Sequence, residues 1–140
     1  MRVTLRNGAL GHVSSANGAV RTPTTVLVAV QSYEIREGLV AMLSAREGFQ
    51  VVGEASTCEE ALDVARTHHP HLALIDQELP GLGGCWTIRA VQNERLAQVI
   101  VALGRRADGV LAEVAGAQAY VQMGTAPREL LSTLEAAIQA

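Results

Sequence analysis

Few residues in this chain could do chemistry, and one carboxylate stands in a distinctive place. Asp is found at three positions, Asp63, Asp76 and Asp108, and Asp76 closes the apolar run HLALID at 71–76. All 11 basic residues are Arg. Because the chain has no Lys, any mechanism that needs an ammonium group from this protein is excluded. Chemistry at Asp76 would have to proceed without a lysine.

Other groups that could do chemistry have simpler interpretations. His68, His69 and His71 could bind Zn²⁺ or Ni²⁺, but a solvated polar loop is the favoured interpretation of this cluster. The glycines of LPGLGG at 79–84 could cradle a phosphate through backbone N–H groups. They lack the spacing of a nucleotide-binding loop, so a tight turn is favoured. Nothing in the sequence indicates an activated thiol at Cys85.

Length and composition indicate one globular domain. A chain of 140 residues has the modal size of a single domain. Its 49% hydrophobic and 18% charged content excludes disorder throughout. A net charge of −3 does not indicate a basic surface of the kind that binds nucleic acid or an acidic membrane. No apolar run is long enough to cross a membrane. Two cysteines outside any CxxC pair fit a reducing compartment, so we expect a cytoplasmic protein.

The chain divides into a polar start and a patterned remainder. Residues 1–23 are small and polar, which predicts a flexible N-terminal tail before a domain over 24–140. Thr57 and Glu60 form a capping box at the start of one predicted helix. The predicted strands are 24–30, 49–55, 71–76, 97–103 and 117–123, and the predicted helices are 33–46, 57 to about 67, one from the 79–84 loop to 94, 109–115 and 127–138. This alternation predicts an α/β parallel sheet that helices cover on both faces.

The predicted strands place a limited set of side chains together. In a parallel α/β sheet, working groups lie beyond the carboxyl ends of the strands. In chain order these ends carry Val30 and Gln31, Glu54, Asp76 to Glu78, Leu103 to Arg105, and Met123.

At this point the residues resemble the receiver domain of bacterial two-component response regulators, especially the NarL/LuxR class. The resemblance covers roughly residues 25–140 and implies a flavodoxin-like (βα)5 doubly wound sheet with strand order 2-1-3-4-5. It rests on REGLVAML at 36–43, VVGEAS at 51–56, LALIDQELPGLGG at 72–84, QVIVAL at 98–103, AGAQAYV at 115–121 and PRELLSTLEAAI at 127–138.

The resemblance places Asp76 at the position of the family's phosphoacceptor. A working receiver also needs an acidic pair for Mg²⁺, a Thr or Ser, and a Lys. Val30 and Gln31 stand in place of the acidic pair, Leu103 in place of the Thr or Ser, and Met123 in place of the Lys. We therefore expect Mg²⁺ binding to be lost and the chain to need no cofactor.

Two further expectations concern the mouth of this site. Glu78 and Arg105 follow neighbouring strands, so their side chains could close the site from above without metal; equally, they could be solvated side chains that never meet. Tyr120 falls at the family's switch aromatic. Because its usual hydroxyl partner is Leu103 here, Tyr120 is expected to be locked rather than switched.

The leading hypothesis is an atypical, phosphorylation-independent receiver, not an enzyme, that acts as a dimerisation or ligand-sensing module in bacterial transcription regulation. Its expected partners are a second copy or a DNA-binding output domain, with a small molecule as a further candidate and no direct binding to nucleic acid or membrane. The alternative is a genuine phosphoacceptor that uses Asp76 in an unorthodox site. A third reading is a module that binds an apolar metabolite in the space that the lost polar groups vacate.

Overall fold

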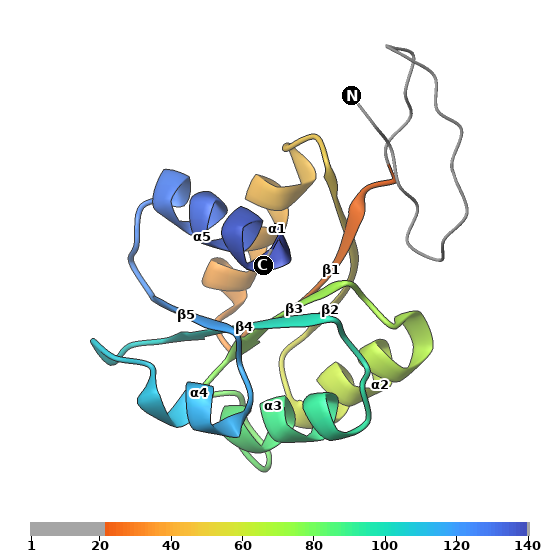
Figure 1. Ribbon diagram of the computed structural model, residues 1–140, viewed down its shortest axis with the longest axis vertical. Coiled ribbons are helices and arrows are strands. Elements are labelled where there is room, and N and C mark those ends of the chain that lie inside the picture. The colour runs from red at the N-terminus through yellow and green to blue at the C-terminus, as the bar shows by residue number, and fades with distance from the viewer. Residues whose placement is uncertain (1–21, 140) are drawn as a thin grey trace.

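A five-stranded parallel sheet organises the chain. The computed structural model describes residues 22–139 (Figure 1). The strand order is β2-β1-β3-β4-β5, which confirms the predicted fold. In chain order the elements are β1 (Thr24–Ala29), α1 (Tyr33–Ser44), β2 (Phe49–Ala55), α2 (Cys58–His68), β3 (Leu72–Asp76), α3 (Gly84–Asn93), β4 (Val99–Gly104), α4 (Val110–Ala115), β5 (Ala119–Gln122) and α5 (Pro127–Gln139).

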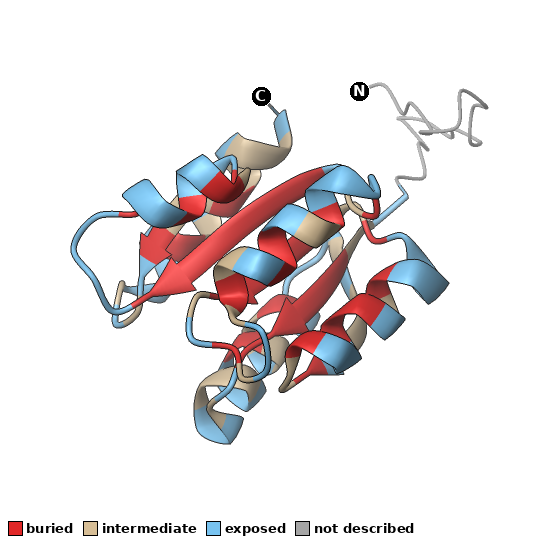
Figure 2. Ribbon diagram, turned by 90° about the horizontal axis from the view of Figure 1, so that it is seen from below, coloured by how far each residue is buried: buried red, intermediate tan, exposed pale blue. Residues whose placement is uncertain are grey.

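Helices cover both faces of the sheet. Figure 1 shows α1 and α5 against one face and α2, α3 and α4 against the other. Val26 and Val28 point into the apolar cluster beneath α1 and α5, whereas Leu27 and Ala29 point to the opposite side, as the two-residue period of a strand requires. Figure 2 shows the central strands buried along their length. We define the α1/α5 cluster by its buried members Val26, Val28, Val30, Leu39, Leu43, Leu72, Leu74, Val99, Val101, Leu103, Val121, Leu130 and Leu134.

Several predicted bounds shift by one or two residues. The strand predicted over 117–123 spans Ala119–Gln122, because β5 pairs only with Val101–Gly104 of β4. The strands predicted over 24–30, 71–76 and 97–103 span 24–29, 72–76 and 99–104. The first helix ends at 44 rather than 46, the third at 93 rather than 94, and the last at 139 rather than 138. The fourth begins one residue later than predicted, with Gly109 as its N-cap.

The predicted capping box at the start of α2 is present. Thr57 is the N-cap, and its hydroxyl accepts a hydrogen bond from the Glu60 N–H at 3.1 Å. Glu60 reaches back to the N–H of Ser56 at 2.8 Å, one residue before the usual partner. The helix proper therefore spans Cys58–His68 rather than 57–67.

The predicted tail, residues 1–23, lies outside the described residues except for Thr22 and Pro23. Among residues 22–139, none of the helices combines the length and the apolar character needed to cross a membrane.

Candidate functional site

The carboxyl ends of β1, β3 and β4 meet around Asp76. It is the last residue of β3, which lies between β1 and β4 in the sheet. Leu103 of β4 is its partner in the strand register, and the turn after β1 brings Gln31 to its other side. The strand ends thus assemble as the sequence predicts.

Main-chain groups hold the Asp76 side chain. The residue is 2% exposed. Its Oδ2 accepts a hydrogen bond from the Gln31 N–H at 3.0 Å, and its Oδ1 accepts one from the Glu78 N–H at 2.9 Å. Both carboxyl oxygens are therefore engaged, and the side chain ties the β1–α1 turn to the β3–α3 loop. A buried acceptor that is satisfied in this way is a structural link as well as a candidate reactive group.

Of the four positions at which the sequence departs from the receiver pattern, three join or pack against the hydrophobic core, whereas Gln31 is exposed. Val30 is fully buried and Leu103 is 3% exposed, and both belong to the α1/α5 cluster. Met123 is half-buried and packs against the same cluster. Its N–H donates to Gly104 O at 2.7 Å, which fixes the end of β5 to that of β4.

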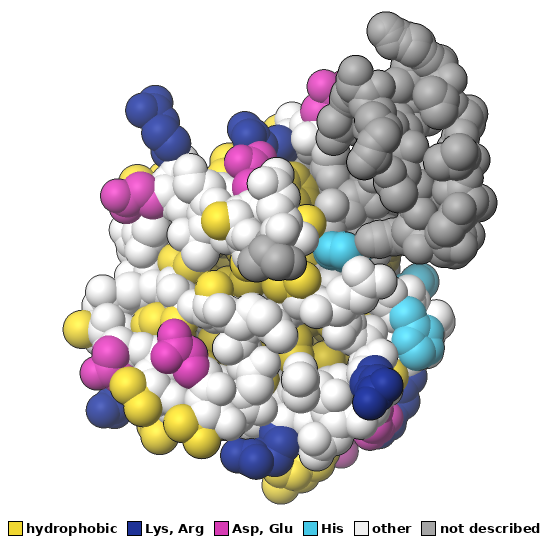
Figure 3. Space-filling model, in the orientation of Figure 1, with side chains coloured by type: hydrophobic (Ala, Val, Ile, Leu, Met, Phe, Trp, Pro, Cys, Tyr) yellow, Lys and Arg dark blue, Asp and Glu magenta, His cyan; other side chains and the backbone are white. Residues whose placement is uncertain are grey.

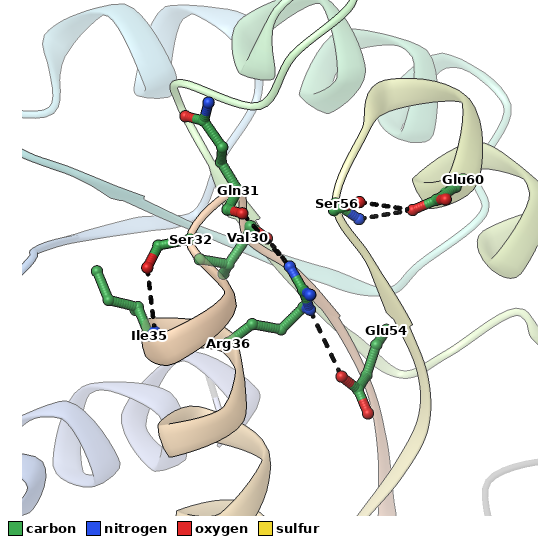
Figure 4. Close-up of polar contacts among 8 residues, drawn as sticks. All are labelled: Val30, Gln31, Ser32, Ile35, Arg36, Glu54, Ser56 and Glu60. Atoms are coloured by element: carbon green, nitrogen blue, oxygen red, sulfur yellow. Dashed lines mark hydrogen bonds and ion pairs between the residues drawn. The ribbon is translucent and has the colours of Figure 1, made fainter.

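An arginine that the sequence reasoning did not single out anchors the turn after β1. Arg36 Nη1 donates to Val30 O at 2.8 Å and approaches Gln31 O at 3.4 Å, and its Nε lies 3.5 Å from Glu54 Oε1 (Figure 4). Ser32 caps α1 by accepting from the Ile35 N–H at 3.2 Å. Figure 4 shows the Gln31 amide pointing away from Arg36. The signal available in the sequence was a basic residue one turn into α1.

The β3–α3 loop is shaped by glycines rather than built around a ligand. Gly81 and Gly83 have φ values of 107° and 99°, in the left-handed region that favours glycine. A Cβ at Gly84 would overlap the backbone oxygen of Asp76, so the loop needs glycine there to pass the strand end. Gly83 O accepts from Thr87 Oγ1 at 2.9 Å. This geometry fits the tight turn that was favoured over a phosphate cradle.

Comparison with known protein families identifies the family to which this chain belongs. The model of the response regulator receiver domain matches residues 26–135. The chain belongs to this family. The resemblance noted in the sequence is thereby confirmed.

Similar proteins include bacterial transcriptional regulators. The chain is 32% identical over 130 residues to the transcriptional regulatory protein PdtaR of Mycobacterium tuberculosis, covering 91% of this chain and 62% of that protein. It is 30% identical over 118 residues to the nitrate/nitrite response regulator protein NarL of Escherichia coli, covering 82% and 55%. A crystal structure of a LuxR-family two-component response regulator from Aurantimonas has a TM-score of 0.75 and 28% identity, over 84% of this chain and 86% of that one. The receiver thus spans little more than half the length of these two curated relatives.

An ion pair lies at the mouth of the receiver site. Arg105 Nε is 3.4 Å from Glu78 Oε1, so these two side chains meet rather than being separately solvated. They remain 69% and 50% exposed. Solvent screening limits such a pair to about 1 kcal/mol or less, so its main effect is on loop geometry.

Tyr120 is half-buried and contacts the β4–α4 loop. Its hydroxyl donates to Arg106 O at 2.7 Å, and a Cβ at Gly109 would overlap its ring. Burial raises the pKa of the Tyr120 hydroxyl above its ordinary value. Gln122 Nε2 donates to Arg105 O at 3.1 Å and adds a second tie between β5 and the same loop. Tyr120, at the position of the family's switch aromatic, thus contacts the β4–α4 loop through its hydroxyl and its ring.

The histidines lie apart from this site, whereas Cys85 lies beside it. His68 and His69 are the last residue and the C-cap of α2, and His71 precedes β3 at the end of that strand opposite Asp76. His69 and His71 line the same hollow. Cys85 accepts from Gln77 Nε2 at 3.7 Å. Within residues 22–139, no group of three or more His, Cys, Asp or Glu side chains is placed to hold a metal ion.

Proposed function

We propose that this receiver works without phosphorylation of Asp76 and serves as an interaction module in bacterial transcription regulation. The observation that carries the proposal is the set of neighbours around Asp76. Two backbone N–H groups occupy its oxygens, and Val30 and Leu103 extend the α1/α5 cluster to its edge.

The donor set at Asp76 does not fit Mg²⁺. The ion demands near-octahedral oxygen coordination that usually includes one or two protein carboxylates. Val30 and Gln31 supply no anionic oxygen, and Glu78 is paired with Arg105. We propose that the chain binds Mg²⁺ no better than an ordinary surface carboxylate does.

Positive charge and a hydroxyl are also missing where a transferring phosphoryl group would need them. Met123 supplies no cation at the end of β5, and Leu103 supplies no hydroxyl at the end of β4. Phosphoryl transfer depends on such groups to offset charge on the oxygens. Losing several of them together supports disuse of the reaction rather than adjustment of its rate.

The alternative function remains phosphoryl acceptance at Asp76 through an unorthodox site. The Glu78–Arg105 pair favours it, because Arg105 places a cation within the same mouth. This cation is exposed and already neutralised by Glu78, which makes it a weak substitute for a buried lysine.

An exposed apolar helix supports a role in protein contacts. On α4, Val110, Leu111 and Val114 are 56%, 57% and 71% exposed. Figure 3 shows hydrophobic side chains gathered over this helix, at the lower left of the view. Contiguous apolar side chains at a surface mark interaction sites. We propose a second copy or a DNA-binding output domain as the partner, and no direct contact of this domain with nucleic acid.

The deciding experiment exposes the protein to acetyl phosphate, or to BeF₃⁻, with Mg²⁺ and records its intact mass and its amide NMR spectrum. We expect no added phosphoryl group and no shift at the amides of Gln31 and Glu78. The matched control is the variant Val30→Asp, Gln31→Asp, Leu103→Thr, Met123→Lys, which should gain the reaction. Stoichiometric phosphorylation of the unaltered chain would overturn the proposal.

A further inference from the structure

An apolar cavity opens beside the altered site, on the α1/α5 face. Its volume is about 310 Å³, and it lies between α1, the end of β5 and the start of α5. Sites for small molecules begin at about this size. Its apolar lining includes the side chains of Ile35, Leu39, Met42, Leu103, Met123 and Leu130.

The chemistry of the lining selects an uncharged ligand. None of the described residues that line the cavity is charged. Its two polar side chains already have partners: Thr125 Oγ1 donates to Gln122 O at 2.6 Å, and Gln122 Nε2 donates to Arg105 O at 3.1 Å. A charged ligand would lose its hydration without gaining a counter-ion, whereas hydrocarbon surface gains by leaving water.

Two glycines line the cavity. Gly38 lies within α1, where glycine destabilises a helix by about 0.5–1 kcal/mol relative to alanine. A Cβ at Gly38 would meet no atom within 4 Å, so packing does not demand glycine there. Gly124 also lines the cavity, has a φ of 93° and is equally free of close neighbours. The wall of the cavity thus carries no side chain at these two positions.

The wall of the cavity includes two of the positions at which this receiver departs from the family. Leu103 and Met123 line it. A Thr and a Lys at these positions would present a hydroxyl and an ammonium group to the same space, which would disfavour an apolar occupant. The substitutions that remove the phosphorylation chemistry also complete the hydrocarbon lining.

We propose that this cavity binds an uncharged, largely hydrocarbon small molecule. Through Leu103 and Met123 the ligand contacts the ends of β4 and β5, and these strands carry the β4–α4 loop and the β5–α5 turn. We take this ligand to be the signal to which the receiver responds. That role rests on the proposed function, whereas binding of the ligand is independent of any reaction at Asp76. Acetyl phosphate tests the proposed function, and an apolar probe tests binding in the cavity. Either proposal can therefore fail while the other stands.

The test uses N-phenyl-1-naphthylamine, an uncharged fluorescent probe, with the whole chain labelled at its methionine methyl groups with ¹³C. The chain has three methionines, and Met42 and Met123 line the cavity. We expect saturable binding of one probe per chain and shifts of the Met42 and Met123 methyl signals, which Met42→Leu and Met123→Leu variants assign.

Matched substitutions on α1 locate the probe. Gly38 lines the cavity and a Cβ there would meet no atom within 4 Å. Gly38→Leu should therefore weaken binding by about tenfold or more. Gly38→Ala should have a smaller effect. The control Ala41→Leu places the same leucine side chain at an exposed position of the same helix outside the cavity, and should leave the affinity unchanged within about twofold.

Three results would overturn the proposal. The first is the absence of saturable binding, and the second is equal affinity in Gly38→Leu and Ala41→Leu. The third is a dimer, seen by sedimentation, that Gly38→Leu abolishes while the probe stays unbound, because a second copy would then be what covers the cavity. Thermal melting of both leucine variants checks that each is folded.

Discussion

Asp76 and its neighbours are held in place by different interactions. The Asp76 side chain is fixed by the N–H groups of Gln31 and Glu78, whereas Val30 and Leu103 are fixed by burial among apolar side chains. Hydrogen bonds to a buried acceptor are costly to break, because the N–H groups left behind lose their partner without regaining water. Asp76 therefore contributes to stability whether or not it reacts.

Replacing Asp76 by Asn separates these roles. Asn offers one oxygen and one NH₂ group, so one of the two backbone N–H donors would face another donor. We expect the free energy of unfolding to fall by about 1–3 kcal/mol, with oligomeric state and partner binding unchanged. Urea denaturation followed by the fluorescence of Trp86, the single Trp, measures the first, and sedimentation and partner titration the others.

The matched control for this change is Asp63→Asn, on the exposed surface of α2, which should shift stability by less than about 0.5 kcal/mol. A change of oligomeric state or a loss of partner binding in a folded Asp76→Asn protein would contradict the proposed function. It would mean that the carboxyl group carries the signal.

A second prediction for a single residue concerns the Tyr120 hydroxyl. Tyr120→Phe removes the hydroxyl that donates to Arg106 O, so we expect a loss of about 0.5–1.5 kcal/mol at neutral pH. Burial raises the Tyr120 pKa, so its contribution is present below the ordinary value of 10.0 and is lost as the pH rises through the folded-state pKa. The difference between the two proteins should therefore shrink in alkaline urea titrations.

Tyr33→Phe is the control, because the Tyr33 side chain is 65% exposed. A difference between Tyr120→Phe and the unaltered chain that grows with alkaline pH would show that the hydroxyl is not held in its neutral form.

At the scale of elements, hydrophobic pattern predicted which segments form, and pairing set where they end. The alternation of apolar strands and amphipathic helices identified all ten elements. β5 stops at Gln122 because its ladder partner β4 stops at Gly104, which residue types alone do not encode. The same pattern predicted which residues lie at the strand ends, and the resemblance to receivers indicated which of them depart from the family. The Arg36 contact was not, because it depends on which way the Val30 carbonyl points.

The start of α2 offers the element-scale prediction. Thr57→Ala removes the hydroxyl that accepts from the Glu60 N–H and should lower the free energy of unfolding by about 1 kcal/mol. Thr67→Ala makes the same chemical change in the last turn of the same helix, at an exposed position. It should be neutral or slightly stabilising, because alanine has the better helix propensity. Equal effects in urea denaturation would show that the cap does not stabilise α2.

At the scale of the molecule, the sheet separates two apolar clusters that depend on each other. The β1 side chains alternate between them, so neither face can be uncovered without exposing strands that support the other. Burial of the sheet on both faces could be predicted from the unbroken apolar runs. The cavity beside α1 could not, because a gap of about 310 Å³ results from how α1, β5 and α5 meet rather than from any one segment.

Truncating one side chain of α5 tests this mutual dependence. Leu134 is fully buried in the α1/α5 cluster, so Leu134→Ala should lower the free energy of unfolding by about 2–5 kcal/mol through lost burial and the cavity left behind. Leu111→Ala, on the exposed face of α4, makes the same change where little is buried, and should shift stability by less than about 0.5 kcal/mol.

Trp86 lies on α3, across the sheet from α5. If the two faces unfold together, Trp86 fluorescence and circular dichroism will give the same lowered midpoint and an unchanged denaturant dependence for Leu134→Ala. A circular dichroism transition that precedes the fluorescence transition would show that α5 detaches while the opposite face stays folded.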